Sequence, residues 1–272
     1  MNYIIRMIDR YSYSKLSTFN SCPQKYKINY IDKVYNSSES IEAFMGKRVH
    51  EVLEWLYSQE GLHEKYIVFD KLANKYNELW KEKWHNEIFV ALCKYDKLSY
   101  NKNSVYKIGL ECLRNYYADF SKHGYFNSNV IGIEEEFNTF IHDFQFKGYI
   151  DRIDKNSDGS IEIIDYKTGK QYKTMKQAEK DLQLAIYFLA CRKKFKETKD
   201  IYLNLYFLRS RKYVRIKHNN EKISTLENKI NENVNMLIKE KQFQAKESIL
   251  CEWCYYWKEC EIKSTNNPSV RI

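Results

Sequence analysis

The feature that most restricts the fold is a change in hydrophobic period near residue 128. From about Lys15 to Asn127, apolar residues recur every three or four positions, which predicts helices. Strand patterns then dominate, and the NSDGS turn at 156–160 predicts a tight hairpin. The predicted strands are 129–137, 140–154, 161–167, 201–208 and 213–217, and the predicted later helices are 174–196 and 222–241. This order predicts an α/β fold in which helices flank a central mixed β-sheet.

The chain contains no internal repeat, low-complexity linker or Gly/Pro-rich break, so we expect a single domain over residues 1–272. The longest apolar run, LQLAIYFLAC, is too short to cross a bilayer. The first residues, MNYIIRMIDRYSYSK, lack the continuous apolar segment of a signal peptide. We therefore expect a cytoplasmic protein without a membrane partner.

The charge balance favours a polyanionic partner. Lys and Arg number 45 against 36 Asp and Glu, a formal net charge of +9, which is typical of nucleic-acid-binding proteins. An AT-rich genome would also enrich Lys, Asn, Tyr and Ile, so charge alone supports this interpretation only modestly. The 24 tyrosines offer stacking surfaces but fit core packing equally well.

Acidic side chains gather on the predicted hairpin. Alternate residues of a strand share a face, so Asp165 and Lys167 should point the same way, and hairpin pairing should bring Asp151 near Asp165. Converging carboxylates repel each other unless a cation lies between them, and oxygen ligands suit Mg²⁺ or Mn²⁺. Lys167 could then orient the attacking water and stabilise charge on a phosphate. An exposed cross-strand ion pair would show the same D-x-K pattern and is more common.

Two helical segments place polar residues one turn apart. His50 and Glu54 have this spacing in GKRVHEVLE, as do Gln183 and Tyr187 in DLQLAIYFLA. A core histidine and an ordinary helix surface are the alternative interpretations.

Three of the seven cysteines form a compact C-x2-C-x5-C pattern near the C-terminus, at Cys251, Cys254 and Cys260. In a reducing compartment such a group favours metal binding over disulfides. Three thiolates are one fewer than a tetrahedral site needs. Three other cysteines lie in apolar helical segments, and we expect them to fill the core: Cys93, Cys112 and Cys191.

These polar residues, in this order, resemble the PD-(D/E)XK nuclease superfamily, and specifically its RecB-like exonuclease branch. The resemblance rests on His50, on Asp151 in GYIDRID, on IIDYKTGK, and on the Q-x-x-x-Y pair. The segment YSYSKLSTFNSCPQKY is similar to the N-terminal segment of the iron–sulfur members, such as the AddB nuclease domain and the CRISPR-adaptation exonucleases. The resemblance covers residues 12–262 apart from 60–127, interpreted as a helical insert. GYIDRID departs from a literal Pro-Asp, as is common in this branch.

The resemblance implies a restriction-endonuclease-like core and a metal-dependent deoxyribonuclease, with exonuclease action expected. His50, Asp151 and Asp165 would bind Mg²⁺ or Mn²⁺ together with the Tyr166 carbonyl, and Lys167 would be the catalytic lysine. Gln183 and Tyr187 would hold the DNA strand. DNA repair, recombination and CRISPR adaptation are the expected pathways, with a helicase or a CRISPR-adaptation protein as partner.

The resemblance also implies a fourth thiolate. Cys22 would join the three cysteines of segment 249–262 around a 4Fe–4S cluster and so connect the N- and C-terminal segments. Pro23 suits the first position of a helix, which would place Cys22 at the N-cap, where the helix dipole favours a thiolate. Zinc also accepts four thiolates, but its ligands usually come as two local pairs.

Two other functions stay open. One is a non-catalytic DNA-binding scaffold stabilised by a structural iron–sulfur or zinc site. The nuclease site of such a scaffold would be inactive and would not require the complete set of polar residues found here. The other is a zinc-stabilised protein-interaction module, which leaves Asp151, Asp165 and Lys167 unexplained.

Overall fold

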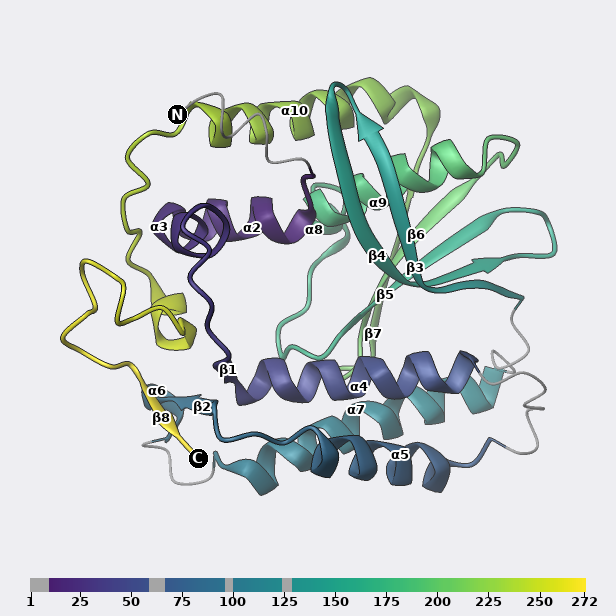
Figure 1. Ribbon diagram of the computed structural model, residues 1–272. Coiled ribbons are helices and arrows are strands. Elements are labelled where there is room, and N and C mark those ends of the chain that lie inside the picture. Colours follow the sequence, from purple (N-terminus) through teal and green to yellow (C-terminus); the bar gives the residue numbers. More distant parts are fainter. Residues whose placement is uncertain (1–9, 59–66, 96–99, 124–128) are drawn as a thin grey trace.

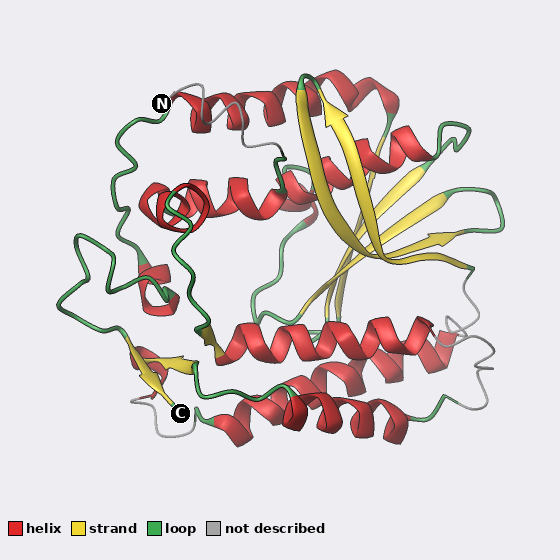
Figure 2. Ribbon diagram, in the orientation of Figure 1, coloured by secondary structure: helices red, strands yellow, loops and turns green. Residues whose placement is uncertain are grey.

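A five-stranded sheet forms the centre of the molecule, with helices on both faces (Figures 1 and 2). The computed structural model describes residues 10–58, 67–95, 100–123 and 129–272. The strands lie in the order β3, β4, β5, β6, β7; in this sheet β5 and β6 pair in parallel, and the other neighbouring strands pair antiparallel. Their bounds are β3 Val130–Ile141, β4 Phe144–Lys155, β5 Ile161–Lys167, β6 Ile201–Phe207 and β7 Lys212–His218. The predicted α/β class and mixed sheet are confirmed.

The hairpin between β4 and β5 follows the predicted turn. Gly159 takes the positive φ of +81° that this turn requires, and Asp158 Oδ1 accepts a hydrogen bond of 2.9 Å from the Ser160 backbone N–H. The turn fixes the register in which Arg152 faces Ile164. The preceding turn lies at residues 142–143 rather than 138–139, because β3 continues to Ile141.

The helices divide into two groups, one on each face of the sheet (Figure 1). One group packs with residues such as Ile163 and Leu203, and the other packs with Ile164, Tyr166 and Tyr206, so the sheet has a buried core on each side. The first group is α2 Tyr13–Ser21, α3 Pro23–Tyr26, α9 Leu182–Lys194 and α10 Ile223–Lys239, and the second is α4 Ile41–Ser58, α5 Phe69–Glu82 and α7 Lys102–His123. Within the described residues, every helix is too short or too polar to cross a bilayer.

The predicted helix over 174–196 is two helices, α8 Met175–Ala178 and α9. Asp181 begins α9 as its N-cap, since its side chain accepts a hydrogen bond of 3.0 Å from the Leu184 backbone N–H. The break leaves Gln183 in the first turn of α9.

The region from Lys15 to Asn127 is not wholly helical, which corrects the prediction. β1 Glu39–Ser40, β2 Ile88–Ala91 and β8 Ser269–Arg271 form a second, three-stranded sheet. All four residues of β2 are buried, and a short apolar run of this kind cannot be assigned by periodicity. Within 60–127 the structure has α5, β2, α6 Leu92–Tyr95 and α7, while 60–66, 96–99 and 124–127 lie outside the described residues.

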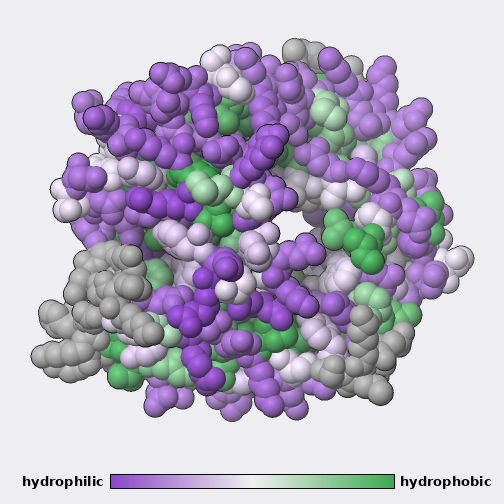
Figure 3. Space-filling view, turned by 180° about the vertical axis from the view of Figure 1, so that it is seen from behind, coloured by the Kyte–Doolittle hydropathy of each residue, from purple (hydrophilic) through white to green (hydrophobic). Residues whose placement is uncertain are grey.

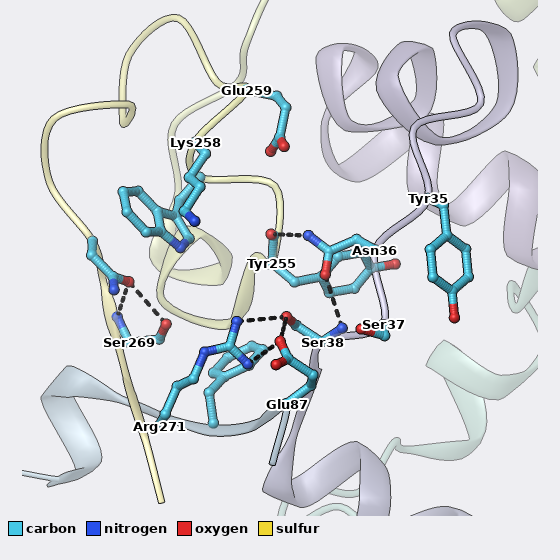
Figure 4. A pocket seen from close by; sticks show the side chains of 13 residues that line it. Tyr35, Asn36, Ser37, Ser38, Glu87, Tyr255, Lys258, Glu259, Ser269 and Arg271 are labelled. Atoms are coloured by element: carbon cyan, nitrogen blue, oxygen red, sulfur yellow. Dashed lines mark hydrogen bonds and ion pairs between the residues drawn. The ribbon is translucent and has the colours of Figure 1, made fainter. Parts of the chain in front are cut away.

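The C-terminal segment is tied to residues near β1 and β2 by polar contacts around a cavity of about 390 Å³ (Figure 4). Arg271 forms an ion pair with Glu87 and donates a hydrogen bond of 3.2 Å to Ser38 Oγ. Asn36 Nδ2 donates a bond of 2.7 Å to the Tyr255 carbonyl. These contacts anchor the chain end beside the start of α4.

The α4–α5–α7 packing gives a stability prediction. Gly→Ala in a helix normally stabilises by up to about 1 kcal/mol, but a Cβ at Gly109 of α7 would lie 2.0 Å from the Tyr76 hydroxyl. Tyr76 is fully buried and cannot move away, so we expect Gly109→Ala to destabilise by about 1–3 kcal/mol. Thermal melting would measure this. Gly169→Ala, where a Cβ meets open space, is the control and should melt like the parent.

Candidate active site and cysteine pocket

Two carboxylates lie together where β4 and β5 pair. Asp151 Oδ2 accepts a hydrogen bond of 2.7 Å from the Tyr166 backbone N–H, so Asp151 is tied directly to the strand that carries Asp165. Asp165 is almost fully buried, and its Oδ2 atom lacks a hydrogen bond of normal geometry. The role proposed for the Tyr166 carbonyl stays a prediction.

Lys167 lies on the same face of β5 as Asp165. Its Nζ atom is 2.5 Å from Asp165 Oδ2 and donates a hydrogen bond of 2.9 Å to Gln183 Oε1 on α9. Gln183 Nε2 donates to the Tyr187 hydroxyl at 2.8 Å, and that hydroxyl donates to the Tyr149 carbonyl of β4 at 2.7 Å. The two residues of the Q-x-x-x-Y pair are therefore connected to the lysine by hydrogen bonds.

His50 reaches the site from α4. Its Nδ1 atom is 3.5 Å from Asp151 Oδ2, and its ring meets the edge of Tyr166 with centroids 6.1 Å apart. Gly46, one turn earlier, permits this approach, because a Cβ there would lie 3.0 Å from Thr168 Oγ1. The side chain opens into a cavity of about 490 Å³ that is also lined by Glu54.

Glu134 completes a group that the sequence did not reveal. The ligand atoms of His50, Glu134 and Asp151 lie within 4.8 Å of one another, the single such group of three among the described residues. Glu134 is on β3 with a φ of +42°, an unusual conformation for a residue other than glycine. The run EEE at 134–136 does not distinguish it from its neighbours. Asp165 falls outside this group and is paired with Lys167, and its role as a metal ligand stays a prediction.

The electrostatics show an excess of negative charge. Burial and the neighbouring Asp151 carboxylate raise the pKa of Glu134 to about 7. Burial likewise raises the pKa of Asp165, against the effect of Lys167. Burial opposes a charged His50, but Asp151 outweighs it and raises the pKa of this histidine, and Asp165 similarly raises the pKa of Lys167. A divalent cation would remove the repulsion between these carboxylates.

The donor set fits a small divalent cation. Two carboxylates and an imidazole lie close together, His50 and Glu134 line an open cavity, and carboxylate oxygens suit Mg²⁺ and Mn²⁺. A cation held there would supply charge stabilisation and would activate a bound water.

The structure places four cysteines around a second, smaller cavity. Cys22, which ends α2 and precedes Pro23, lines this cavity with Cys251, Cys254 and Cys260. Backbone N–H groups point at two sulfurs: Lys246 N is 3.5 Å from Cys22 Sγ, and Ser248 N is 3.4 Å from Cys251 Sγ.

Of the cysteines assigned to the core, Cys112 and Cys191 are buried as expected. Cys93 is partly exposed on α6, which corrects that prediction. The short helix lies at the surface beside the end of the chain and does not enclose it.

A family model of the PD-(D/E)XK nuclease superfamily matches residues 10–261. The chain belongs to this superfamily. The predicted family and its restriction-endonuclease-like fold are thus confirmed, and the protein is a nuclease. No curated protein matches the sequence.

One solved structure supports the same fold for this nuclease. A protein from Eubacterium rectale, provisionally assigned as an exonuclease, superposes with a TM-score of 0.50 at 10% identity, over 95% of this chain and 88% of that chain. The structure of SSO0001 matches with a TM-score of 0.36 at 16% identity, over 81% of this chain and 97% of that chain. At these identities the first likeness concerns the fold alone.

The His50–Glu134–Asp151 group predicts that Mn²⁺ stabilises the folded nuclease. A ligand at a hundredfold excess over its Kd stabilises by about 2.7 kcal/mol, and a tenfold weaker Kd reduces this to about 1.4 kcal/mol. We therefore expect Glu134→Gln to reduce the Mn²⁺-induced rise in Tm by about half at such a concentration. Glu82→Gln, on the exposed end of α5, is the control. Equal Mn²⁺ shifts in the two variants would exclude Glu134 as a ligand.

Proposed function

We propose that this nuclease is a Mg²⁺- or Mn²⁺-dependent deoxyribonuclease that degrades DNA as an exonuclease. The observation that supports the proposal most is the His50–Glu134–Asp151 group, which lies beside the Asp165–Lys167 pair at the end of β5. This set contains ligands for a cation and a fixed ammonium group, which phosphodiester hydrolysis requires.

Each of the site residues has a distinct role in this proposal. The raised pKa of Lys167 keeps its ammonium protonated near neutral pH, so it donates hydrogen bonds to the attacking water or a phosphate oxygen rather than acting as a base. Asp165 holds Lys167 in place and adds negative charge beside the cation site. Gln183 and Tyr187 fix the other side of the lysine and contact the substrate strand.

An opening through the molecule supports action from a strand end. Figure 3 shows it near the centre of the space-filling view, at the level between α2 and α4 in Figure 1. His50 is on α4, and Tyr13, the first residue of α2, lines a cavity with Gln183, the hydrogen-bond partner of Lys167. We propose that a DNA strand enters this opening by its end, which favours exonuclease over internal cleavage.

The four cysteines are proposed to bind a 4Fe–4S cluster, which would assign the chain to the iron–sulfur members of the RecB-like branch. Among the described residues, no three of these sulfurs lie within 4.8 Å of one another. Four thiolates on one zinc, each about 2.3 Å from the metal, would be less than about 4 Å apart. A four-iron cluster separates its cysteines further, because metal and sulfide atoms lie between them.

The remaining assignments are proposals of the same kind. Residues 1–272 form one nuclease domain with an insert at 60–127 and a cluster-binding segment at 249–262. The expected setting is cytoplasmic DNA repair, recombination or CRISPR adaptation, with a helicase or an adaptation protein as partner. A non-catalytic scaffold is less well supported, since it would not require the complete cation and lysine site.

Asp165→Ala tests the catalytic proposal. We expect it to lower the rate of Mn²⁺-dependent degradation of end-labelled DNA by at least about 100-fold, because it removes the group that positions Lys167. Glu162→Gln on the same strand contacts Tyr213 and Arg215 instead, and it should stay active. Melting curves would check that both variants fold. An Asp165→Ala variant as active as the control would place catalysis elsewhere.

The cluster proposal predicts about four irons and four sulfides per chain after purification without oxygen. Cys22→Ser should lose the iron and several kcal/mol of stability, because the clip between distant segments is lost. Cys93→Ser, whose thiol lies away from this cavity, should keep both. Zinc in place of iron in the parent would refute the cluster, and an unchanged iron content in Cys22→Ser would remove Cys22 from the ligand set.

A further inference from the structure

Helix α7 carries none of the proposed site residues, although it packs beside α4 on one face of the sheet (Figure 1). It belongs to the segment 60–127 that the resemblance left as an insert. One of its residues, Tyr116, is fully buried in the core between these helices and the sheet, where its ring stacks on Phe120 with centroids 4.1 Å apart. Burial raises the pKa of Tyr116 well above its usual range, so its hydroxyl keeps its proton.

The Tyr116 hydroxyl meets polar groups from three different elements. It accepts a hydrogen bond of 3.1 Å from Arg152 Nη1 on β4, lies 3.3 Å from the Tyr166 hydroxyl on β5, and is hydrogen-bonded to the Tyr57 hydroxyl on α4. A phenolic hydroxyl both donates and accepts, so one group can connect all three elements. We call Tyr116 and these three partners the tyrosine hub.

Two partners in the hub are on the strands that carry the acidic residues of the site. Arg152 directly follows Asp151 on β4, and Tyr166 lies between Asp165 and Lys167 on β5. The backbone N–H of Tyr166 also donates the hydrogen bond of 2.7 Å that holds Asp151 Oδ2. A shift of either strand at the hub would therefore move these carboxylates.

The third partner is on the helix that carries the histidine. Tyr57 follows His50 by about two turns of α4, so the two side chains are on the same side of this helix. The Tyr57 ring lies 4.1 Å from the Arg152 guanidinium, and the His50 ring meets the edge of Tyr166. The hub thus connects α4 to both strands.

The hub is itself held in place at two points. Arg152 is only 1% exposed, and its guanidinium donates to both oxygens of Asp154, at 2.7 and 2.5 Å. On α7, one residue before Tyr116, Asn115 Nδ2 donates a hydrogen bond of 3.0 Å to the Leu208 carbonyl, directly after β6. The position of the Tyr116 oxygen is therefore fixed relative to the sheet.

We infer that Tyr116 is a positioning residue for the cation site, whose hydroxyl fixes β4, β5 and α4 relative to one another. The inference rests on the proposed function and gives α7, within the segment 60–127, a part in the metal site. The effect of Tyr116 is indirect, because its partners are neighbours of the ligand side chains. Groups that orient metal ligands typically change metal affinity by about 10- to 100-fold, and an indirect effect belongs at the low end.

Tyr116→Phe removes the hydroxyl and keeps the stacked ring. Mn²⁺ binding is measured by titration, from the electron paramagnetic resonance signal of free Mn²⁺, which requires no cleavage. We expect the Kd for Mn²⁺ to rise about 10-fold. The cleavage rate at a limiting Mn²⁺ concentration should fall and should recover as Mn²⁺ is raised. The KM for DNA should stay within about 2-fold, because Tyr116 is buried behind the site and does not contact the substrate.

Tyr76→Phe is the matched control. Tyr76 is also fully buried in the same core, and its hydroxyl has no hydrogen-bond partner among the described residues. The substitution removes the same atom from the same kind of environment without touching the hub. It should therefore keep the parent Kd for Mn²⁺, whatever its effect on Tm.

Tyr166→Phe tests the same contact from the other side, since it keeps the backbone N–H that holds Asp151. We expect it to weaken Mn²⁺ binding by about 3-fold, and it replaces Tyr116→Phe should that variant melt below the assay temperature. Because both hydroxyls act through one contact, the double variant should lose less affinity than the product of the two single losses.

A Kd for Mn²⁺ in Tyr116→Phe equal to that of Tyr76→Phe would overturn the inference, as would single losses that multiply in the double variant. The proposed function fails in a different way. A parent that binds Mn²⁺ but does not cleave DNA would reject the nuclease proposal, while a weaker Kd in Tyr116→Phe would still support the hub. A parent that cleaves DNA while Tyr116→Phe binds Mn²⁺ normally would reject the hub alone.

Discussion

The site depends on the pairing of β4 with β5, which brings two carboxylates into one partly buried space. Asp151 is held by the Tyr166 backbone N–H and Asp165 by the Lys167 ammonium, so neither can turn away from the other. Burial first, and the neighbouring Asp151 carboxylate in addition, raises the pKa values of Asp165 and Glu134, which reflects the cost of charge in this site. A cation bound there would relieve this cost, and the proposed chemistry would in that way depend on the fold.

A buried polar cluster on the opposite face of the sheet holds β4, the strand that carries Asp151, in place. Arg152, next to Asp151 but on the opposite face, donates to Asp154 at 2.7 and 2.5 Å and to the Tyr116 hydroxyl at 3.1 Å. The Tyr116 hydroxyl in turn lies 3.3 Å from the hydroxyl of Tyr166, the residue between Asp165 and Lys167 on β5. The Arg152–Tyr116 and Tyr116–Tyr166 contacts link β4 to α7 and α7 to β5, so the paired strands have little freedom to shift the carboxylates.

The sequence was most informative where a contact is local. Strand alternation and one turn are enough to predict that Asp151, Asp165 and Lys167 meet, because pairing across a short hairpin leaves few registers. Glu134 could not be predicted in this way. Glu134 is on a separate strand, β3, where it has a positive φ. The run EEE does not indicate which of its three glutamates would lie at the site. The small sheet of β1, β2 and β8 was missed for a related reason, since it joins segments far apart in the chain.

The central claim is that a divalent cation binds between His50, Glu134 and Asp151. Anomalous diffraction at the manganese edge, from crystals grown with Mn²⁺, would test it most directly. The account predicts a peak within about 2.5 Å of ligand atoms from all three side chains, as expected for oxygen and nitrogen ligands of such ions. A peak elsewhere, or none in this cavity at saturating Mn²⁺, would contradict the account.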